Sequence, residues 1–288
     1  MNKTSTTDHP NLQMLKLGGS LITDKTQPRT PRNQTITRLA KEIKNAYSRN
    51  PDLQLILGHG AGSFAHVPAK LYGTRQGVRS ERDWQGFIQV WREAVALNQL
   101  VMQALNDAGL PAISLPPSAS LTTSSGQVYA WDLSPLKSAL NAGLLPIIYG
   151  DVIFDHQLGG TILSTEDLFS HLSRHLHPKR LLLAGREPGV WVDYKARTKI
   201  FSQITPDNLE QVTDSLGGSA GDDVTGGMVS KVLQMVSLVT EIPDLRILIF
   251  SGEEPGLVEN TLLGDMPGTL VANMSFTSKQ TDPKFSTL

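Results

Sequence analysis

Three short apolar segments of the chain each end at a glycine. The segments span residues 12–17, 53–57 and 144–149, and they are followed by Gly18, Gly58 and Gly150. A short apolar run that ends at glycine is typical of a buried strand in a parallel sheet. Residues 35–48 and 80–108 lie between these runs and place their apolar residues at helical spacing. Alternating strands and helices predict an α/β fold, a three-layer α/β/α sandwich with an open, mostly parallel sheet.

The composition narrows the class of protein. Of the 288 residues, 39% are hydrophobic and 18% are charged, and the net charge of −1 argues against nucleic acid as a partner. The chain has no cysteine, which excludes disulfides, thiolate zinc sites and cysteine nucleophiles. No apolar run approaches the roughly 20 residues that span a bilayer, and residues 1–11 lack the apolar segment of a signal peptide. We therefore expect no membrane partner and a cytoplasmic location.

The chain is expected to form a single domain over residues 12–272 with one continuous sheet. No internal repeat and no linker rich in proline, glycine or serine interrupts it. Residues 121–131 and 152–162 predict two β-hairpins. Residues 1–11 and 273–288 are predicted to be flexible tails.

The turn after the second apolar segment has the composition of a phosphate site. It reads Gly-His-Gly-Ala-Gly-Ser-Phe-Ala-His over residues 58–66. Gly60 and Gly62 allow the backbone to approach a ligand, Ser63 suits a helix N-cap or a phosphate donor, and His66 would lie in the first helical turn. The alternative interpretation is a tight strand–helix turn with a solvated histidine.

The three glycine turns are expected to meet in one crevice, because ligands of open parallel sheets bind beyond the carboxyl ends of the strands. Lys16 lies inside the first apolar strand, and its neighbours Leu15 and Leu17 would point to the opposite face. A buried lysine needs a partner, which we expect to be an anionic ligand or Asp151. The alternative is a lysine at the strand edge that reaches water.

A second phosphate site is predicted where Gly226 and Gly227 open a helix that carries Lys231 about one turn later. The alternative there is a solvated helix lysine. Lys25, on the loop after Gly19, has no assignable role from its position alone.

Four segments together resemble the amino acid kinase superfamily and, within it, the isopentenyl phosphate kinases. They are residues 16–20 with Lys25, residues 59–66, residues 149–151, and residues 223–228 with Lys231. The resemblance covers roughly residues 15–271, and His66 is the residue that distinguishes isopentenyl phosphate kinases from relatives that act on carboxylates. It implies an acceptor lobe over residues 12–163, a nucleotide lobe over residues 164–272, and a homodimer by analogy.

The resemblance implies transfer of the γ-phosphoryl group of ATP to isopentenyl phosphate, giving isopentenyl diphosphate and ADP in isoprenoid biosynthesis. Lys16 would contact the transferring phosphoryl group, Lys25 would stabilise the transition state and Lys231 would hold ATP phosphates. His66 would bind the acceptor phosphate, and Asp151 would orient the catalytic lysine. Mg²⁺ would be carried by the ATP phosphates and not by protein ligands.

The resemblance also assigns residues to the two ligands. The substrate-binding residues would be Gly60, Ala61, Gly62, Ser63, Ala65, His66 and Gly150. The ATP-binding residues would be Lys16, Gly18, Gly19, Ser20, Ala61, Gly185, Asp223, Gly226, Gly227 and Lys231. The chain departs from the family at Ala61 and Ala65, where glycine is usual, and at residues 185–189, where an Asp-Val-Asp-Gly-like turn is common.

The chemistry of the reaction agrees with this set of residues. A phosphate monoester is largely a dianion at pH 7, so the acceptor is already a nucleophile and no catalytic base is required. His66 is then better interpreted as a charge-assisted donor than as a proton acceptor. Phe87, Val90 and Trp91 would form one wall for the prenyl tail, although aromatic residues at helical spacing are more often core.

Two other functions remain open from the sequence. The first is another small-molecule kinase of the same fold, with fosfomycin kinase nearest and UMP kinase and acetylglutamate kinase more distant. The second is a non-catalytic nucleotide sensor. The presence of Lys16, Lys25, Asp151 and Lys231 argues against the sensor, which we would expect to have lost at least one of them.

Overall fold

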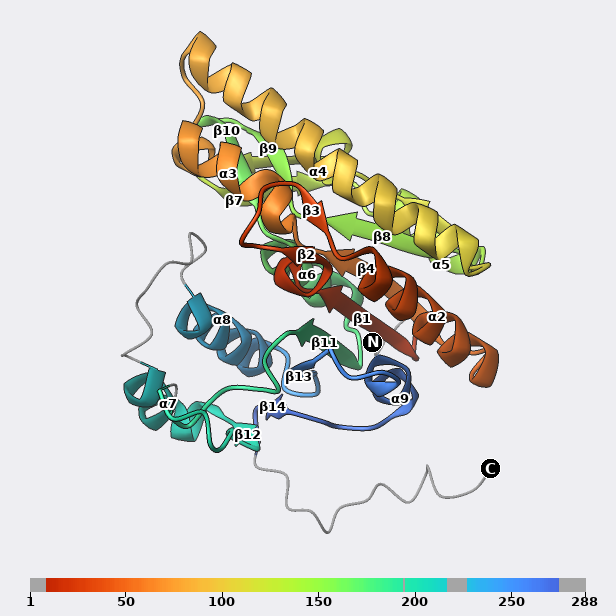
Figure 1. The fold of residues 1–288 in the computed structure, drawn as a ribbon. Coiled ribbons are helices and arrows are strands. Elements are labelled where there is room, and N and C mark those ends of the chain that lie inside the picture. The colour runs from red at the N-terminus through yellow and green to blue at the C-terminus, as the bar shows by residue number, and fades with distance from the viewer. Residues whose placement is uncertain (1–8, 194, 217–226, 275–288) are drawn as a thin grey trace, which may run out of the picture.

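An eight-stranded sheet runs through the centre of the molecule (Figure 1) in the computed structural model, which describes residues 9–193, 195–216 and 227–274. Its strands are β1 (Leu12–Leu17), β4 (Gln54–His59), β5 (Ala112–Ser114), β8 (Leu145–Tyr149), β11 (Arg180–Gly185), β12 (Gln203–Ile204), β13 (Arg246–Ser251) and β14 (Thr269–Val271). Their order is β12-β14-β13-β11-β1-β4-β8-β5. Only β13 and β14 are antiparallel neighbours. The predicted mostly parallel sheet is confirmed.

Helices cover both faces of this sheet. They are α1 (Gly19–Ile22), α2 (Asn33–Arg49), α3 (Gly62–Tyr72), α4 (Glu81–Asp107), α5 (Ser134–Asn141), α6 (Thr165–Leu176), α7 (Leu209–Leu216), α8 (Gly227–Glu241) and α9 (Leu257–Leu263). Three short 3-10 turns are η1 (Thr74–Gln76), η2 (Pro117–Ala119) and η3 (Pro206–Asn208). The two helices predicted from residues 35–48 and 80–108 are confirmed as α2 and α4. Among the described helices, none is both long enough and apolar enough to cross a membrane.

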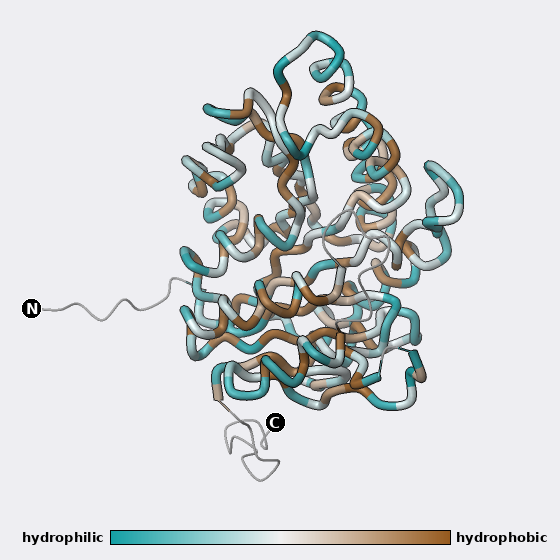
Figure 2. The backbone as a smooth tube through the Cα atoms, turned by 90° about the vertical axis from the view of Figure 1, so that its left-hand side faces the viewer, coloured by the Kyte–Doolittle hydropathy of each residue, from teal (hydrophilic) through white to brown (hydrophobic). Residues whose placement is uncertain are grey.

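Alternate side chains of the central strands belong to two separate cores. Met14 of β1 packs in a core with α6, α7 and α8, whereas Leu15 packs in a core with α2, α4 and α9. This follows from the two-residue period of a strand, which sends neighbouring side chains to opposite faces. Figure 2 shows hydrophobic residues concentrated inside the molecule and hydrophilic residues at the outer turns. The predicted three-layer α/β/α arrangement is confirmed.

The expectation of one continuous sheet is wrong. The two predicted hairpins are present, as β6 (Leu121–Ser124) with β7 (Gln127–Trp131) and β9 (Asp151–Asp155) with β10 (Gly159–Leu163). They pair with each other in a separate four-stranded sheet, of order β10-β9-β6-β7. Gly150 separates β8 of the main sheet from β9 of the second sheet, so the chain changes sheets there. A third, two-stranded ribbon joins β2 (Thr23–Asp24) and β3 (Thr30–Pro31).

Candidate active site

A cavity of about 940 Å³ lies at the carboxyl ends of the central strands. Most of the residues assigned from the sequence line it. They are Lys16, Gly18, Gly19, Ser20, Lys25, Gly60, Ala61, Gly62, Ala65, His66, Gly150, Gly185, Gly227 and Lys231. Ser63 and Asp151 are not among its lining residues, and Asp223 and Gly226 lie outside the described residues. The structure thus brings the three predicted glycine turns into one crevice.

Two of these turns touch backbone to backbone, which explains their glycines. A side-chain carbon added at Gly19 would lie 2.5 Å from the backbone nitrogen of Gly62. Gly62 itself has a φ of +53°, in the left-handed region that favours glycine. The backbone nitrogen of Gly60 also donates to the carbonyl oxygen of Leu17 at 3.0 Å. Glycine at these positions is therefore needed to bring β1 and β4 together at the floor of the cavity.

The amino terminus of α3 lies at the cavity, and its own N-cap residue makes no side-chain hydrogen bond to the helix. Its N-cap is Ala61, in a right-handed helical conformation that alanine adopts without strain. Ser63, predicted as the cap or as a phosphate donor, has a structural role instead. Its backbone nitrogen donates to Thr23 Oγ1 at 2.9 Å, and its Oγ accepts a hydrogen bond from the backbone nitrogen of Thr30 at 3.2 Å. Ser63 therefore joins α3 to the ribbon that carries Lys25.

A single carboxylate holds two of the predicted lysines. Lys16 Nζ donates to Glu166 Oε1 at 2.7 Å, and Lys231 Nζ lies 3.6 Å from the same oxygen. The side chains of Lys16 and Glu166 are only 9% and 10% exposed. Lys16 extends from β1, Glu166 from the first turn of α6 and Lys231 from α8. Three separate elements thus converge on one buried ion cluster at the cavity wall.

Burial and charge act on this cluster in opposite directions. Burial lowers the pKa of Lys16, as do the nearby charges of Lys231 and Lys25, while Glu166 opposes the change. Burial would raise the pKa of Glu166, but the charges of Lys16 and Lys231 outweigh it and bring that pKa to about 2. Glu166 is therefore an anion at neutral pH, surrounded by more positive charge than it can neutralise.

Asp151 is not the partner of Lys16, which corrects the prediction. Its carboxylate accepts hydrogen bonds from the backbone nitrogens of Ser118, at 3.3 Å, and Val152, at 2.9 Å. The physical reason is the change of sheet at Gly150, which carries Asp151 into β9, beside η2. Burial raises the pKa of Asp151 to about 6. Its role in the structure is to bind backbone, and Glu166 takes the place predicted for it.

The sequence contained a signal that could have identified Glu166. Ser164 and Asp167 form a reciprocal capping box at the start of α6. Such a box uses the acid three residues after the cap, so Asp167 is committed to the helix end. Glu166 is then the acid left to face the crevice.

Lys25 lies at the turn of the β2–β3 ribbon and is exposed. The ribbon is held on both sides of this lysine. Across the lysine, Thr26 donates from its backbone nitrogen and its hydroxyl to Asp24 Oδ1. After it, Arg29 Nε lies 3.1 Å from Glu93 Oε2 of α4, and its guanidinium lies over the ring of Phe64. The position of Lys25 is thus coupled to α3 and α4.

Apolar side chains line part of the cavity beside His66. They are Ala65, Ala69, Val90, Ile162 and Leu163, and Lys70, Arg75 and Gln76 also line the cavity. Of the three residues predicted as a prenyl wall, only Val90 lines the cavity.

Phe87 is buried behind that wall, where it packs against Gly160 and the ring of Trp84. Trp91 is 42% exposed and does not line the cavity. The other histidine of the turn, His59, is buried and bonded through Nε2 to Asn98 Oδ1 at 3.1 Å. His59 therefore supports the fold, whereas His66 faces the cavity.

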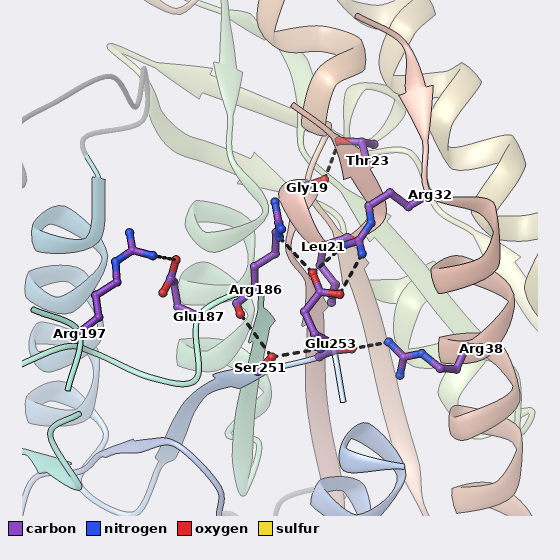
Figure 3. A network of polar contacts seen from close by, with 11 residues as sticks. Gly19, Leu21, Thr23, Arg32, Arg38, Arg186, Glu187, Arg197, Ser251 and Glu253 are labelled. Carbon is purple, nitrogen blue, oxygen red and sulfur yellow. Dashed lines mark hydrogen bonds and ion pairs between the residues drawn. The ribbon is translucent and has the colours of Figure 1, made fainter. Parts of the chain in front are cut away.

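Charged residues line another part of the cavity (Figure 3). Glu253 binds both Arg32 and Arg186, and Glu187 lies 3.5 Å from Arg197. All five side chains line the cavity, and sequence reasoning assigned none of them. Lysine and arginine outnumber acids around the whole cavity. The basic residues are Lys16, Lys25, Arg32, Lys70, Arg75, Arg186, Arg197 and Lys231, and the acids are Glu166, Glu187 and Glu253.

This excess of positive charge suits a polyanionic ligand. The three acids of the cavity are each bound to cationic side chains. In the described parts of the chain, no group of three or more histidine, aspartate or glutamate residues is arranged to hold a metal ion.

The chain is similar in sequence and in fold to known proteins. Residues 11–251 match the family model described as the amino acid kinase family. The chain is 32% identical over 267 residues to an isopentenyl phosphate kinase of Methanocaldococcus jannaschii, covering 90% of this chain and 97% of that protein. It is 34% identical over 264 residues to one of Methanothermobacter thermautotrophicus, covering 88% and 95%. A crystal structure of an isopentenyl phosphate kinase superposes with a TM-score of 0.76 at 29% identity, covering 91% of this chain and all of that one.

Proposed function

The chain belongs to the amino acid kinase family, and on this premise we propose that it is an isopentenyl phosphate kinase. It transfers the γ-phosphoryl group of ATP to isopentenyl phosphate and releases isopentenyl diphosphate and ADP. The observation that carries the proposal is the cavity itself. The ion cluster of Lys16, Glu166 and Lys231 shares it with His66 and with apolar side chains such as Val90 and Ile162. One cavity thus offers sites for a polyphosphate, for a phosphate acceptor and for a prenyl tail.

The lysines supply the charge that the reaction needs. During transfer, the bond between the γ-phosphorus and the bridging oxygen breaks as an acceptor phosphate oxygen bonds to that phosphorus, and negative charge remains on ADP. Lys16 and Lys231 are held in place by Glu166 before any ligand binds, so little reorganisation is required. Lys25 lines the same cavity from the β2–β3 ribbon. Catalysis is then mainly alignment and charge neutralisation.

His66 and the amino terminus of α3 bind the acceptor phosphate. The amino terminus of α3 lines the cavity at Gly62, and the helix dipole favours an anion there. The acceptor is a dianion at neutral pH and attacks without a base. His66 therefore positions the phosphate by donating a hydrogen bond, and the prenyl tail occupies the apolar part of the cavity lined by Val90 and Ile162. On this assignment, residues 12–163 carry the acceptor site and residues 164–272 most of the nucleotide site.

Mg²⁺ enters this proposal as an ion bound to the phosphates of ATP, where it neutralises part of their charge. Each glutamate of the cavity already has a cationic partner, so the phosphate oxygens are its better ligands. The protein is proposed to act in the cytoplasm as a homodimer, by analogy with its relatives. Ile88 and Trp91 on α4, 52% and 42% exposed, offer an apolar surface for that dimer.

A coupled ADP-release assay with Mg-ATP tests the proposal. The acceptors to compare are isopentenyl phosphate, dimethylallyl phosphate, fosfomycin, UMP and acetylglutamate. We expect a strong preference for the prenyl phosphates that is abolished in His66→Ala. His156→Ala is the matched control, because His156 is an exposed histidine outside the cavity. Turnover of fosfomycin or UMP instead would refute the substrate but retain the kinase, and ATP binding without turnover of any acceptor would favour a nucleotide sensor.

A further inference from the structure

Glu253 holds two arginines at the rim of the cavity (Figure 3). Arg32 Nη1 donates to Glu253 Oε1 at 2.6 Å, and Arg32 Nη2 donates to Glu253 Oε2 at 2.9 Å. Arg186 Nε donates to Glu253 Oε1 at 3.0 Å from the other side. The backbone of Glu253 is held as well, because its nitrogen donates to Ser251 Oγ at 3.1 Å. Two guanidinium groups are thus anchored to one point on the loop after β13.

The two arginines use their donors differently. Arg32 Nη1 also donates to the carbonyl oxygen of Leu21 at 3.0 Å, so both of its terminal nitrogens have partners, and its side chain is 30% exposed. Arg186 is bound through Nε alone, and its side chain is 61% exposed. Its two terminal nitrogens have no hydrogen-bond partner within the described residues. Arg32 therefore completes the anchor, whereas Arg186 keeps the two-pronged end of its guanidinium available.

The backbone beside Arg186 is joined to the glycine turns of the site. The backbone nitrogen of Gly18 donates to the carbonyl oxygen of Ala184 at 2.8 Å. The backbone nitrogen of Gly252 donates to the carbonyl oxygen of Gly185, also at 2.8 Å. The Oγ of Ser251 donates to the carbonyl oxygen of Arg186 at 3.3 Å. Arg186 therefore projects into the cavity from a rigid strand end, beside the turn that begins at Gly18.

We propose that Arg186 is a further binding residue for the phosphate chain of the nucleotide. A guanidinium held through Nε presents Nη1 and Nη2 as parallel donors, the geometry that binds two phosphate oxygens at once. This inference rests on the proposed kinase function and adds a specific cation to its nucleotide side. The acceptor phosphate is the other source of the same chemistry. Arg186 is assigned to the nucleotide because it extends from β11, next to the turn after β1 and across the cavity from α3.

Nucleotide binding without acceptor tests the assignment separately from turnover. Adenosine and ADP are compared as competitors of a fluorescent ADP analogue on wild-type protein, Arg186→Ala and Arg186→Gln. Arg49→Ala is a matched control, because Arg49 is also 61% exposed and lies 3.0 Å from a glutamate oxygen, but outside the cavity. We expect Arg186→Ala to weaken the binding of ADP about 10- to 100-fold and the binding of adenosine less than about twofold. Arg49→Ala should change neither ligand.

The outcomes separate this inference from the proposed function. Equal weakening of adenosine and ADP, or unchanged ADP binding in a variant with a wild-type thermal transition, would refute the role of Arg186. Weaker binding of isopentenyl phosphate with unchanged binding of ADP would also refute it, since the contact would then belong to the acceptor. If the wild-type protein fails to phosphorylate isopentenyl phosphate, selective loss of ADP binding in the variant still supports Arg186. Arg186→Gln decides the question if Arg186→Ala does not fold, because glutamine keeps a polar side chain but removes the guanidinium.

Discussion

Removal of the charge of Glu166 tests the central feature of the site. Glu166→Gln keeps the size of the side chain and an oxygen that can accept from Lys16, but it removes the anion that lies 2.7 Å from Lys16 Nζ. At an effective dielectric of 20, a charge pair at this distance interacts by roughly 6 kcal/mol. Lys16 would then face Lys231 and Lys25 without an opposing charge. The pKa of Lys16 must fall, because its charged form loses its stabilising partner.

The pH profile of kcat/KM for ATP measures this effect, because it reports on groups of the free enzyme. We expect the alkaline limb of the profile to move down by about 1 to 3 pH units in Glu166→Gln, with activity partly recovered at low pH. Asp167→Asn is the control, since Asp167 is the adjacent acid but caps α6 and binds Arg75. A Glu166→Gln profile that superposes on the wild-type profile would refute the proposed electrostatic role.

The same substitution predicts a change in stability. Lys16 and Lys231 bring the pKa of Glu166 to about 2, against 4.5 for an ordinary glutamate. A depressed carboxyl pKa stabilises the fold above the ordinary value, and the stabilisation is lost as the pH falls toward the folded value. The difference corresponds to about 3 kcal/mol at neutral pH. Urea denaturation at pH 7 should therefore show Glu166→Gln less stable by about that amount, and a variant as stable as wild type would contradict the assigned pairing.

Three further predictions concern other parts of the site. Asp151→Asn should retain turnover and raise the free energy of unfolding at pH 8 by about 3 kcal/mol, because burial raises the pKa of Asp151 to about 6 and the fold loses stability as the pH rises from 3.8 through that value. Urea denaturation at pH 4 and pH 8 checks this, and loss of activity would restore Asp151 to the mechanism. Glu93→Gln should lower kcat about tenfold with little change in the KM for ATP, since it loosens the ribbon that carries Lys25; an equal effect on KM would count against this. Phe87→Ala should favour longer prenyl phosphates in the ADP-release assay, with Trp91→Ala, outside the cavity, leaving chain-length preference unchanged.

The sequence predicted the features that depend on backbone geometry. Apolar runs that end at glycine identified β1, β4 and β8, because a short run of that kind is typical of a buried strand. The turns after them meet in the cavity because neighbouring parallel strands place their carboxyl ends at one edge. Gly19 and Gly62 meet because no side chain separates them. These relations follow from local sequence and from the general rules of α/β sheets.

The sequence did not predict which side chains would pair across the cavity. An anionic ligand or Asp151 was expected as the partner of Lys16, because the glycine turns after their strands were expected to meet in one crevice. The pairing depended on which strands share a sheet, and the separate pairing of β9 with β10 and β6 moved Asp151 away. Glu166 lies on a helix and 150 residues after Lys16 in the chain. Local periodicity carries no information on such a contact, although the capping box of α6 restricted the choice.

The arrangement of charge explains how one glutamate can serve a site that must bind a polyanion. Glu166 neutralises one positive charge, so it positions Lys16 and Lys231 but leaves the cavity with excess positive charge. A second buried acid beside the lysines would improve their pairing and weaken their attraction for phosphate. Asp151, bonded to backbone in the second sheet, does not fill that place. The cavity therefore keeps its excess positive charge because the chain changes sheets at Gly150 and carries Asp151 away from the lysines. The number of acids in the sequence does not decide this.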